Sequence, residues 1–138
     1  MKRAIGFFCL AVFFVAAATA AQAGWISEIS EITFQNEVIE ADMPVIVWFF
    51  FNPGVSVYDA FSNAIDKVSQ KNAMRVKVLK MDSQYNSITG DRYKIKKSNT
   101  FVLFVEGKEV ARSSEIRGEK DFGAFIDSCL GPPPKVTK

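Results

Sequence analysis

Few residues of this 138-residue chain could carry out covalent chemistry. The sequence contains two cysteines and no histidine, so the commonest general base and the commonest metal ligand are both missing. Cys9 lies in an apolar run near the N-terminus, which leaves Cys129 as the thiol of the remaining chain. One thiol forms no intramolecular disulfide and gives a structural zinc site almost no ligands. We therefore expect no metal, no cofactor and a fold that depends on its hydrophobic core.

Ser56 and Cys129 remain as candidates for nucleophilic chemistry. Ser56 has no histidine and no nearby lysine to activate its hydroxyl group, so the sequence favours a helix N-cap instead. Cys129 falls at helical spacing from Phe122, Phe125 and Ile126, which favours a thiol packed in the core. The alternative is a reactive thiol near the C-terminus that forms a mixed or intermolecular disulfide.

The first 23 residues have the pattern of an export signal. Lys2 and Arg3 precede an apolar run, and Ala21 and Ala23 are the small residues that signal peptidase requires. We expect a signal peptide at 1–23, cleavage after Ala23, and a periplasmic or secreted protein; an uncleaved membrane anchor is the alternative. Removing Lys2 and Arg3 from the 17 basic residues leaves as many as the 15 acidic ones. This balance excludes a general attraction to nucleic acid or anionic membranes.

Apolar periodicity predicts alternating strands and helices after this segment. Residues 45–51 are apolar at every position, which is typical of a strand covered on both faces of a sheet. Residues 57–68 carry apolar side chains at helical spacing, and the next strand is expected at 74–81. The other expected elements are a short strand at 28–32, a helix at 33–41, a short helix at 86–92, a hairpin of strands at 101–105 and 109–113, and a terminal helix at 122–130.

One domain is expected at residues 24–130. This length suffices for one hydrophobic core and is too short for two. The sequence shows no internal repeat that would indicate a second unit. Gly131 and three prolines end the terminal helix, so we expect a proline-rich tail at 131–138.

The order of these elements and several short phrases resemble the thioredoxin family over nearly all of residues 28–130. The resemblance implies an α/β fold of the thioredoxin-like type, a three-layer sandwich with a mixed central sheet of about five strands and about four flanking helices. No phrase is specific alone, but they occur in the family's order and at nearly its spacing. The phrases are Met43-Pro44-Val45-Ile46-Val47 before Phe49, Lys80-Met81-Asp82, Tyr93-Lys94-Ile95, Thr100-Phe101-Val102-Leu103-Phe104, Glu106-Gly107-Lys108-Glu109-Val110 and Phe125-Ile126-Asp127.

Three positions depart from the family pattern, and each belongs to a different part of its chemistry. Gly54-Val55-Ser56-Val57 stands where the family has its C-x-x-C motif, so these positions hold no sulfur for disulfide exchange. Trp48, an apolar filler, stands where members often carry a buried acid that assists proton transfer. Asn99 stands in place of the family's cis-proline. A cis bond before a residue other than proline costs roughly 3 kcal/mol, so we expect a trans bond there.

From these departures the sequence predicts a protein that is not an enzyme and has no dithiol oxidoreductase activity. The degenerate site is expected to bind a protein or peptide as an accessory module of the cell envelope. Two alternatives remain open: a monothiol redox protein or sensor that acts through Cys129, and a structural subunit of an envelope complex.

The resemblance also implies the place of a binding groove, at the active-site turn, at the loop before the fourth strand and at the loop before the last helix. Basic side chains at 92, 94, 96, 97 and 117 are expected beside it, which indicates either an acidic partner or a solvated loop. The expected partner is an unidentified protein or peptide, without nucleic acid and, after cleavage, without a membrane. The candidate groove residues are Pro53, Tyr58, Ser98, Thr100 and Arg117.

Overall fold

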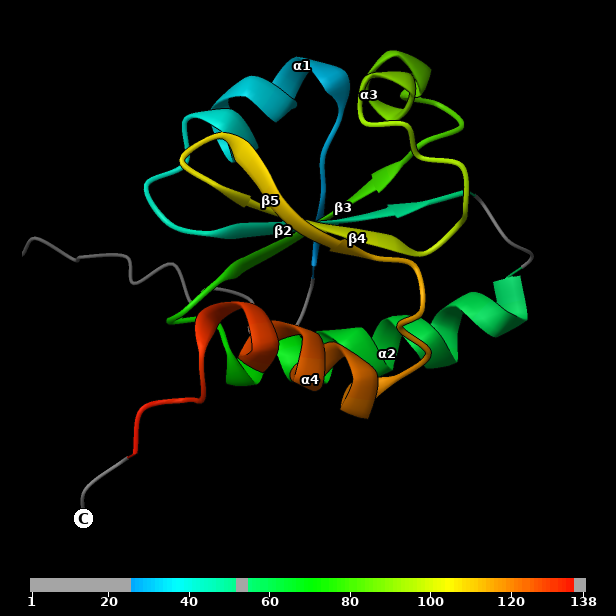
Figure 1. Cartoon of the computed structure of the whole chain (residues 1–138). Coiled ribbons are helices and arrows are strands. Elements are labelled where there is room, and N and C mark those ends of the chain that lie inside the picture. The colour runs from blue at the N-terminus through cyan, green and yellow to red at the C-terminus, as the bar shows by residue number, and fades with distance from the viewer. Residues whose placement is uncertain (1–25, 52–54, 136–138) are drawn as a thin grey trace, which may run out of the picture.

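A five-stranded sheet lies at the centre of the fold (Figure 1). The computed structural model describes residues 26–51 and 55–135, without the side chains of residues 55–59. The strands are β1 (Ser27–Glu28), β2 (Val45–Phe50), β3 (Lys77–Asp82), β4 (Thr100–Val105) and β5 (Lys108–Ser113). Their order is β1-β3-β2-β4-β5, with β1, β3 and β2 parallel and with β4 antiparallel to both β2 and β5.

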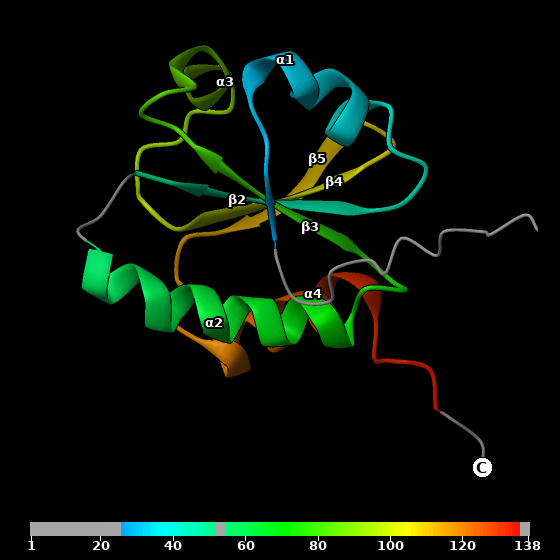
Figure 2. The ribbon, with the colours of Figure 1, turned by 180° about the vertical axis from the view of Figure 1, so that it is seen from behind.

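Helices cover both faces of this sheet. They are α1 (Glu31–Phe34), which continues as the π-helical turn η1 (Gln35–Ile39), α2 (Val55–Lys71), α3 (Ser87–Arg92) and α4 (Glu119–Leu130). Figures 1 and 2 show α1 and α3 on one face and α2 beside α4 on the other. This arrangement confirms the three-layer α/β sandwich with a mixed sheet that the sequence predicted.

Strand β2 is the centre of the sheet, and all six of its residues are buried. It pairs with β3 on one side and with β4 on the other. Its backbone N–H and C=O groups therefore face a neighbouring strand on either side. Its uninterrupted run of β-branched and aromatic residues suits this place because helices cover both faces. The sequence prediction of a strand buried on both sides is confirmed.

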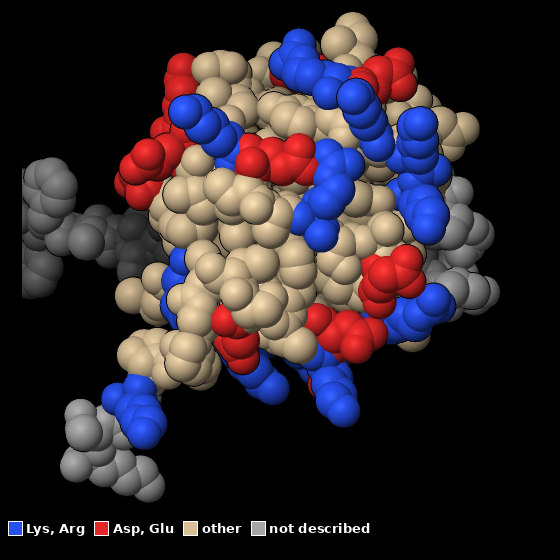
Figure 3. All heavy atoms as spheres, viewed as in Figure 1, with Lys and Arg blue, Asp and Glu red and all other residues tan. Residues whose placement is uncertain are grey.

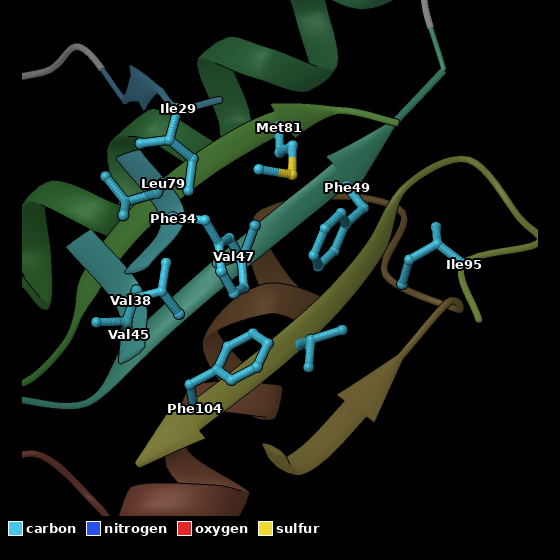
Figure 4. Close-up of a cluster of buried hydrophobic side chains, with 11 residues drawn as sticks. Ile29, Phe34, Val38, Val45, Val47, Phe49, Leu79, Met81, Ile95 and Phe104 are labelled. Atoms are coloured by element: carbon cyan, nitrogen blue, oxygen red, sulfur yellow. The ribbon is translucent and has the colours of Figure 1, made fainter. Parts of the chain in front are cut away.

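Alternate residues of β2 enter two separate hydrophobic clusters. Val45, Val47 and Phe49 belong to the cluster beneath α1 and η1, which Figure 4 shows together with Phe34 and Phe104. The other three belong to the cluster beneath α2 and α4. They are Ile46, Trp48 and Phe50.

Two predicted strand boundaries are wrong. Met74 lies before β3 and is 96% exposed, because the N–H groups of Arg75 and Val76 donate to the Asn72 carbonyl and extend the turn after α2. Ile32 lies in α1 and is 90% exposed. The chain turns into a helix there because Thr33 Oγ1 accepts a hydrogen bond from the Ser30 N–H at 3.1 Å, which satisfies a backbone donor at the helix start.

The β4–β5 hairpin packs its tip against η1. Gly107 in the turn has φ +76°, a conformation that side-chain-bearing residues rarely adopt. A Cβ atom at this position would lie 2.7 Å from the Ile39 carbonyl oxygen. The hairpin therefore needs glycine for two independent reasons, the backbone conformation and the close approach to η1.

Replacing Gly107 with alanine is expected to lower the free energy of unfolding by about 1–3 kcal/mol, because the strained φ is retained and Ile39 has to move. Chemical denaturation followed by circular dichroism measures this change. Gly123→Ala is the matched control, since a Cβ there meets nothing within 4 Å, and it should raise stability by about 0.5–1 kcal/mol within α4. Equal effects of the two changes would contradict the packing role of Gly107.

Candidate functional site

The candidate site lies at the end of the sheet where β2 ends and β4 begins. Phe49 pairs with Thr100 and Phe50 with Asp82, which brings the loop before β4 beside the end of β2. Helix α2 begins nearby in the chain, at Val55. Pro53 and Gly54 lie outside the described residues, as do the side chains of Val55, Ser56, Val57 and Tyr58.

Helix α2 begins earlier than the sequence predicted. It starts at Val55, so Ser56 lies inside the first turn and is not the residue before the helix. The N-cap prediction for Ser56 is therefore wrong. The apolar face of the helix begins at Val57, but a helix can extend beyond its apolar face. Each residue added to an existing helix gains one backbone hydrogen bond, whether or not its side chain is buried.

Trp48 and Asn99, two of the three positions that depart from the family pattern, are hydrogen-bonded to each other. The Trp48 indole Nε1–H donates to the Asn99 side-chain Oδ1 at 2.9 Å. Trp48 is fully buried, and its ring stacks on Phe101 with centroids 5.8 Å apart and planes at 8°. The sequence prediction of an apolar filler captured the packing of Trp48 but missed its N–H donor, which needs an acceptor when it is buried.

The loop before β4 is held by further hydrogen bonds. The peptide bonds in it are trans, as predicted, and Asn99 has φ +60°, which asparagine tolerates better than most residues. Ser98 Oγ accepts a hydrogen bond from the Phe51 N–H at 3.2 Å. Thr100 Oγ1 donates to the Lys97 carbonyl at 2.7 Å. The side-chain oxygens of Ser98 and Thr100 therefore stabilise the loop from within.

Arg117 lies across from this loop, in the segment before α4. Its backbone N–H donates to Asp121 Oδ2 at 3.0 Å. Its guanidinium is 3.6 Å from the Glu115 carboxylate, which is also 3.9 Å from the Lys97 ammonium. Glu115 thus links two of the predicted groove segments. These side chains are 70% or more exposed, so the ion pairs contribute little stability and leave both cations accessible.

A row of exposed basic residues leads into the same loop. Arg92 ends α3, and Lys94, Lys96 and Lys97 follow it. Figure 3 shows basic side chains gathered over α3 and the segment after it. Burial raises the pKa of Tyr93 above its usual 10.0, while the charge of Arg92 lowers it and that of Glu109 raises it. The Tyr93 phenol is therefore neutral at physiological pH and does not offset this positive charge.

Cys129 lies on α4 and is half-buried. It packs against the hydrophobic cluster beneath α2 and α4, and its Sγ is 3.8 Å from the Ser128 hydroxyl oxygen. It is the one free cysteine among residues 26–51 and 55–135. In the same ranges, no cluster of three potential metal-binding residues occurs and no helix is long and apolar enough to cross a bilayer.

Comparison with known proteins identifies the class of protein. A model of the thioredoxin family matches residues 26–128. The thioredoxin of Rickettsia typhi is 33% identical over 105 residues, which cover 76% of this chain and 99% of that protein. Thioredoxin 1 of Synechococcus elongatus is 28% identical over 109 residues, 79% of this chain and 86% of that protein. The chain belongs to the thioredoxin family.

The prediction that the protein is not an enzyme is contradicted by these relatives. They are named thioredoxins, which are dithiol oxidoreductases, and the similarity extends over most of the chain. The prediction rested on Gly54, Trp48, Val57 and Asn99. These four positions belong to one site, around the place of the family's C-x-x-C motif. Their identity does not exclude enzymatic activity elsewhere in a chain that also carries Cys129.

The Trp48–Asn99 hydrogen bond is expected to couple the core to the loop. Trp48→Phe removes the donor, and Asn99→Gly removes the acceptor while allowing the left-handed backbone. A double-mutant cycle from denaturant unfolding should give a coupling energy of about 1 kcal/mol, the usual net contribution of one hydrogen bond. Additive effects of the two substitutions would show that the bond does not stabilise the fold.

Proposed function

We propose that this protein is an exported thioredoxin-like domain that binds an extended segment of a partner protein at the loop Lys97–Thr100. The observation that carries the proposal is the hydrogen bond from the buried Trp48 indole to Asn99. This bond joins the core to the loop at two positions where the family pattern has changed. The proposal of export depends on the N-terminal pattern of Lys2, Arg3 and the small residues that end at Ala23.

The loop is suited to binding because its conformation is already set. Three hydrogen bonds, from Trp48, Phe51 and Thr100, hold it against the end of β2 and its own backbone. A loop that is ordered before binding loses less conformational entropy when a partner arrives. A partner would meet the half-buried residues Ser98 and Asn99 and the exposed charged groups of Lys97 and Arg117. Such polar groups suit an extended peptide better than a small apolar ligand.

Titration of isotope-labelled protein with an unfolded, carboxymethylated polypeptide tests this function. We expect NMR amide shifts to change at Phe51, residues 97–100 and Arg117. Asn99→Gly should weaken binding about fivefold, which corresponds to the loss of one hydrogen bond of about 1 kcal/mol. Met74→Gln is the control, because Met74 is exposed at the opposite end of the sheet, and it should leave binding unchanged. Shift changes confined to other surfaces would refute the proposal.

Thiol chemistry at Cys129 is a second candidate function. Two observations favour it: Cys129 is half-buried rather than fully enclosed, and the relatives are named thioredoxins. The described residues contain no second thiol, so any disulfide exchange by this part of the chain has to proceed through a mixed disulfide at Cys129.

Cys129→Ser separates the two functions. In an assay that contains a small dithiol, which releases Cys129 from the mixed disulfide and is itself oxidised, insulin-reduction activity is expected to disappear in this variant because the attacking sulfur is gone, while the NMR shifts on peptide titration should remain. Ala124→Ser is the matched control, since it places a serine at an exposed position of the same helix and leaves the thiol in place. Activity that persists in Cys129→Ser would exclude a role for this thiol.

A further inference from the structure

The basic row before β4 consists of Arg92, Lys94, Lys96 and Lys97, and is called here the cationic segment. All four side chains are exposed. Within the described ranges, no carboxylate lies at ion-pair distance from the first three, and the nearest to Lys97 is Glu115 at 3.9 Å. The other acidic side chains close to it are Asp91, which is exposed beside Arg92, and Glu109, which pairs with Arg112. Most of its charge is therefore available to a partner.

The cationic segment is anchored to the domain between its charges. Ile95 is buried at 8% exposure, and its N–H donates to the Gly90 carbonyl at 2.8 Å. Arg112 Nη2 donates to the Tyr93 carbonyl at 2.8 Å. The Tyr93 ring packs edge-on against Phe104 with centroids 5.1 Å apart. These contacts fix the backbone, so the positive charges are held in one arrangement and are not spread over a mobile loop.

Lys94 occupies a conformation that is unfavourable for lysine. Its φ is +54°, in the left-handed region where glycine or asparagine meets little strain. The Lys94 side chain is exposed, so burial does not compensate for this strain. The Lys94 N–H donates to the Asp91 carbonyl and the Ile95 N–H to the Gly90 carbonyl, so this conformation is the one that ends α3. Lys94 adds an exposed positive charge at that fixed position.

We propose that the cationic segment binds an acidic stretch of polypeptide, and thereby selects the partner of the adjacent loop Lys97–Thr100. This inference rests on the proposed function and names the chemistry of its ligand. A carboxylate-rich segment is complementary to a short row of fixed cations. Nucleic acid fits less well, because the neighbouring Tyr93 ring packs in the core and is not offered for base stacking. An anionic membrane fits less well because charges balance after Arg3.

Fluorescence anisotropy with short labelled peptides tests the proposal. One peptide alternates Glu and Ser, and its partner has Gln in place of every Glu. The acidic peptide should bind more tightly, with an affinity that falls as salt rises, because exposed charges are screened. The triple variant Arg92→Gln/Lys94→Asn/Lys96→Gln should bind it about tenfold more weakly, because three exposed ion pairs of modest strength are lost. The control is Lys71→Gln/Lys120→Gln/Lys135→Gln, which removes equal charge elsewhere and should bind normally.

A second measurement distinguishes lost charge from lost structure. Lys94→Asn alone should melt at the same temperature as the parent protein or higher, since asparagine tolerates the left-handed conformation, while its affinity for the acidic peptide falls. A lower melting temperature, or unchanged affinity, would count against the role of Lys94.

The outcomes separate this inference from the proposed function. Equal binding of both peptides, with NMR shifts at residues 97–100, would overturn the acidic preference and keep the binding site. Acid-dependent binding with shifts at 92–96 and none at 98–100 would keep the acidic-peptide site on the cationic segment and overturn the proposed function of the loop. Tighter binding of a single-stranded oligonucleotide or of anionic vesicles than of the acidic peptide would overturn the inference.

Discussion

The burial of β2 on both faces is the constraint on which the rest of the structure depends. Six consecutive buried side chains require a layer of structure above the sheet and another below it. Helices α1 and α3 supply one layer, and α2 and α4 supply the other. Because successive residues alternate between the layers, α1 and η1 pack on one set of β2 side chains, and α2 and α4 pack on the other. The end of β2 is consequently a rigid place from which to position a loop.

The site gains its geometry from that rigidity. Trp48 belongs to the cluster beneath α2 and α4, yet its indole N–H reaches the loop before β4. Phe51, the residue after β2, donates its N–H to the same loop. The Lys97–Thr100 loop lies at the edge of the domain, yet it is hydrogen-bonded both to a core side chain and to the residue that follows β2. The cationic segment adds charge next to it without altering these contacts.

Apolar periodicity in the sequence was sufficient to predict the central strand and the two long helices, and the glycine-containing turn Glu106-Gly107-Lys108 was sufficient to predict the hairpin. It failed at Met74 and Ile32, where local backbone hydrogen bonds outweigh apolar character. The π-helical turn η1 has no signature in composition. The Trp48–Asn99 contact joins residues 51 positions apart, so no local pattern reveals it. The prediction that the protein is not an enzyme failed because it drew a conclusion about the whole chain from the residue types at four positions.

The Trp48–Asn99 hydrogen bond has a kinetic consequence. Any large movement of the loop before β4 has to break the hydrogen bond between Asn99 and a fully buried indole. Opening of the loop is therefore coupled to the residue that packs at the centre of the cluster beneath α2 and α4. The loop therefore opens less readily than a surface turn that lacks a hydrogen bond to the core.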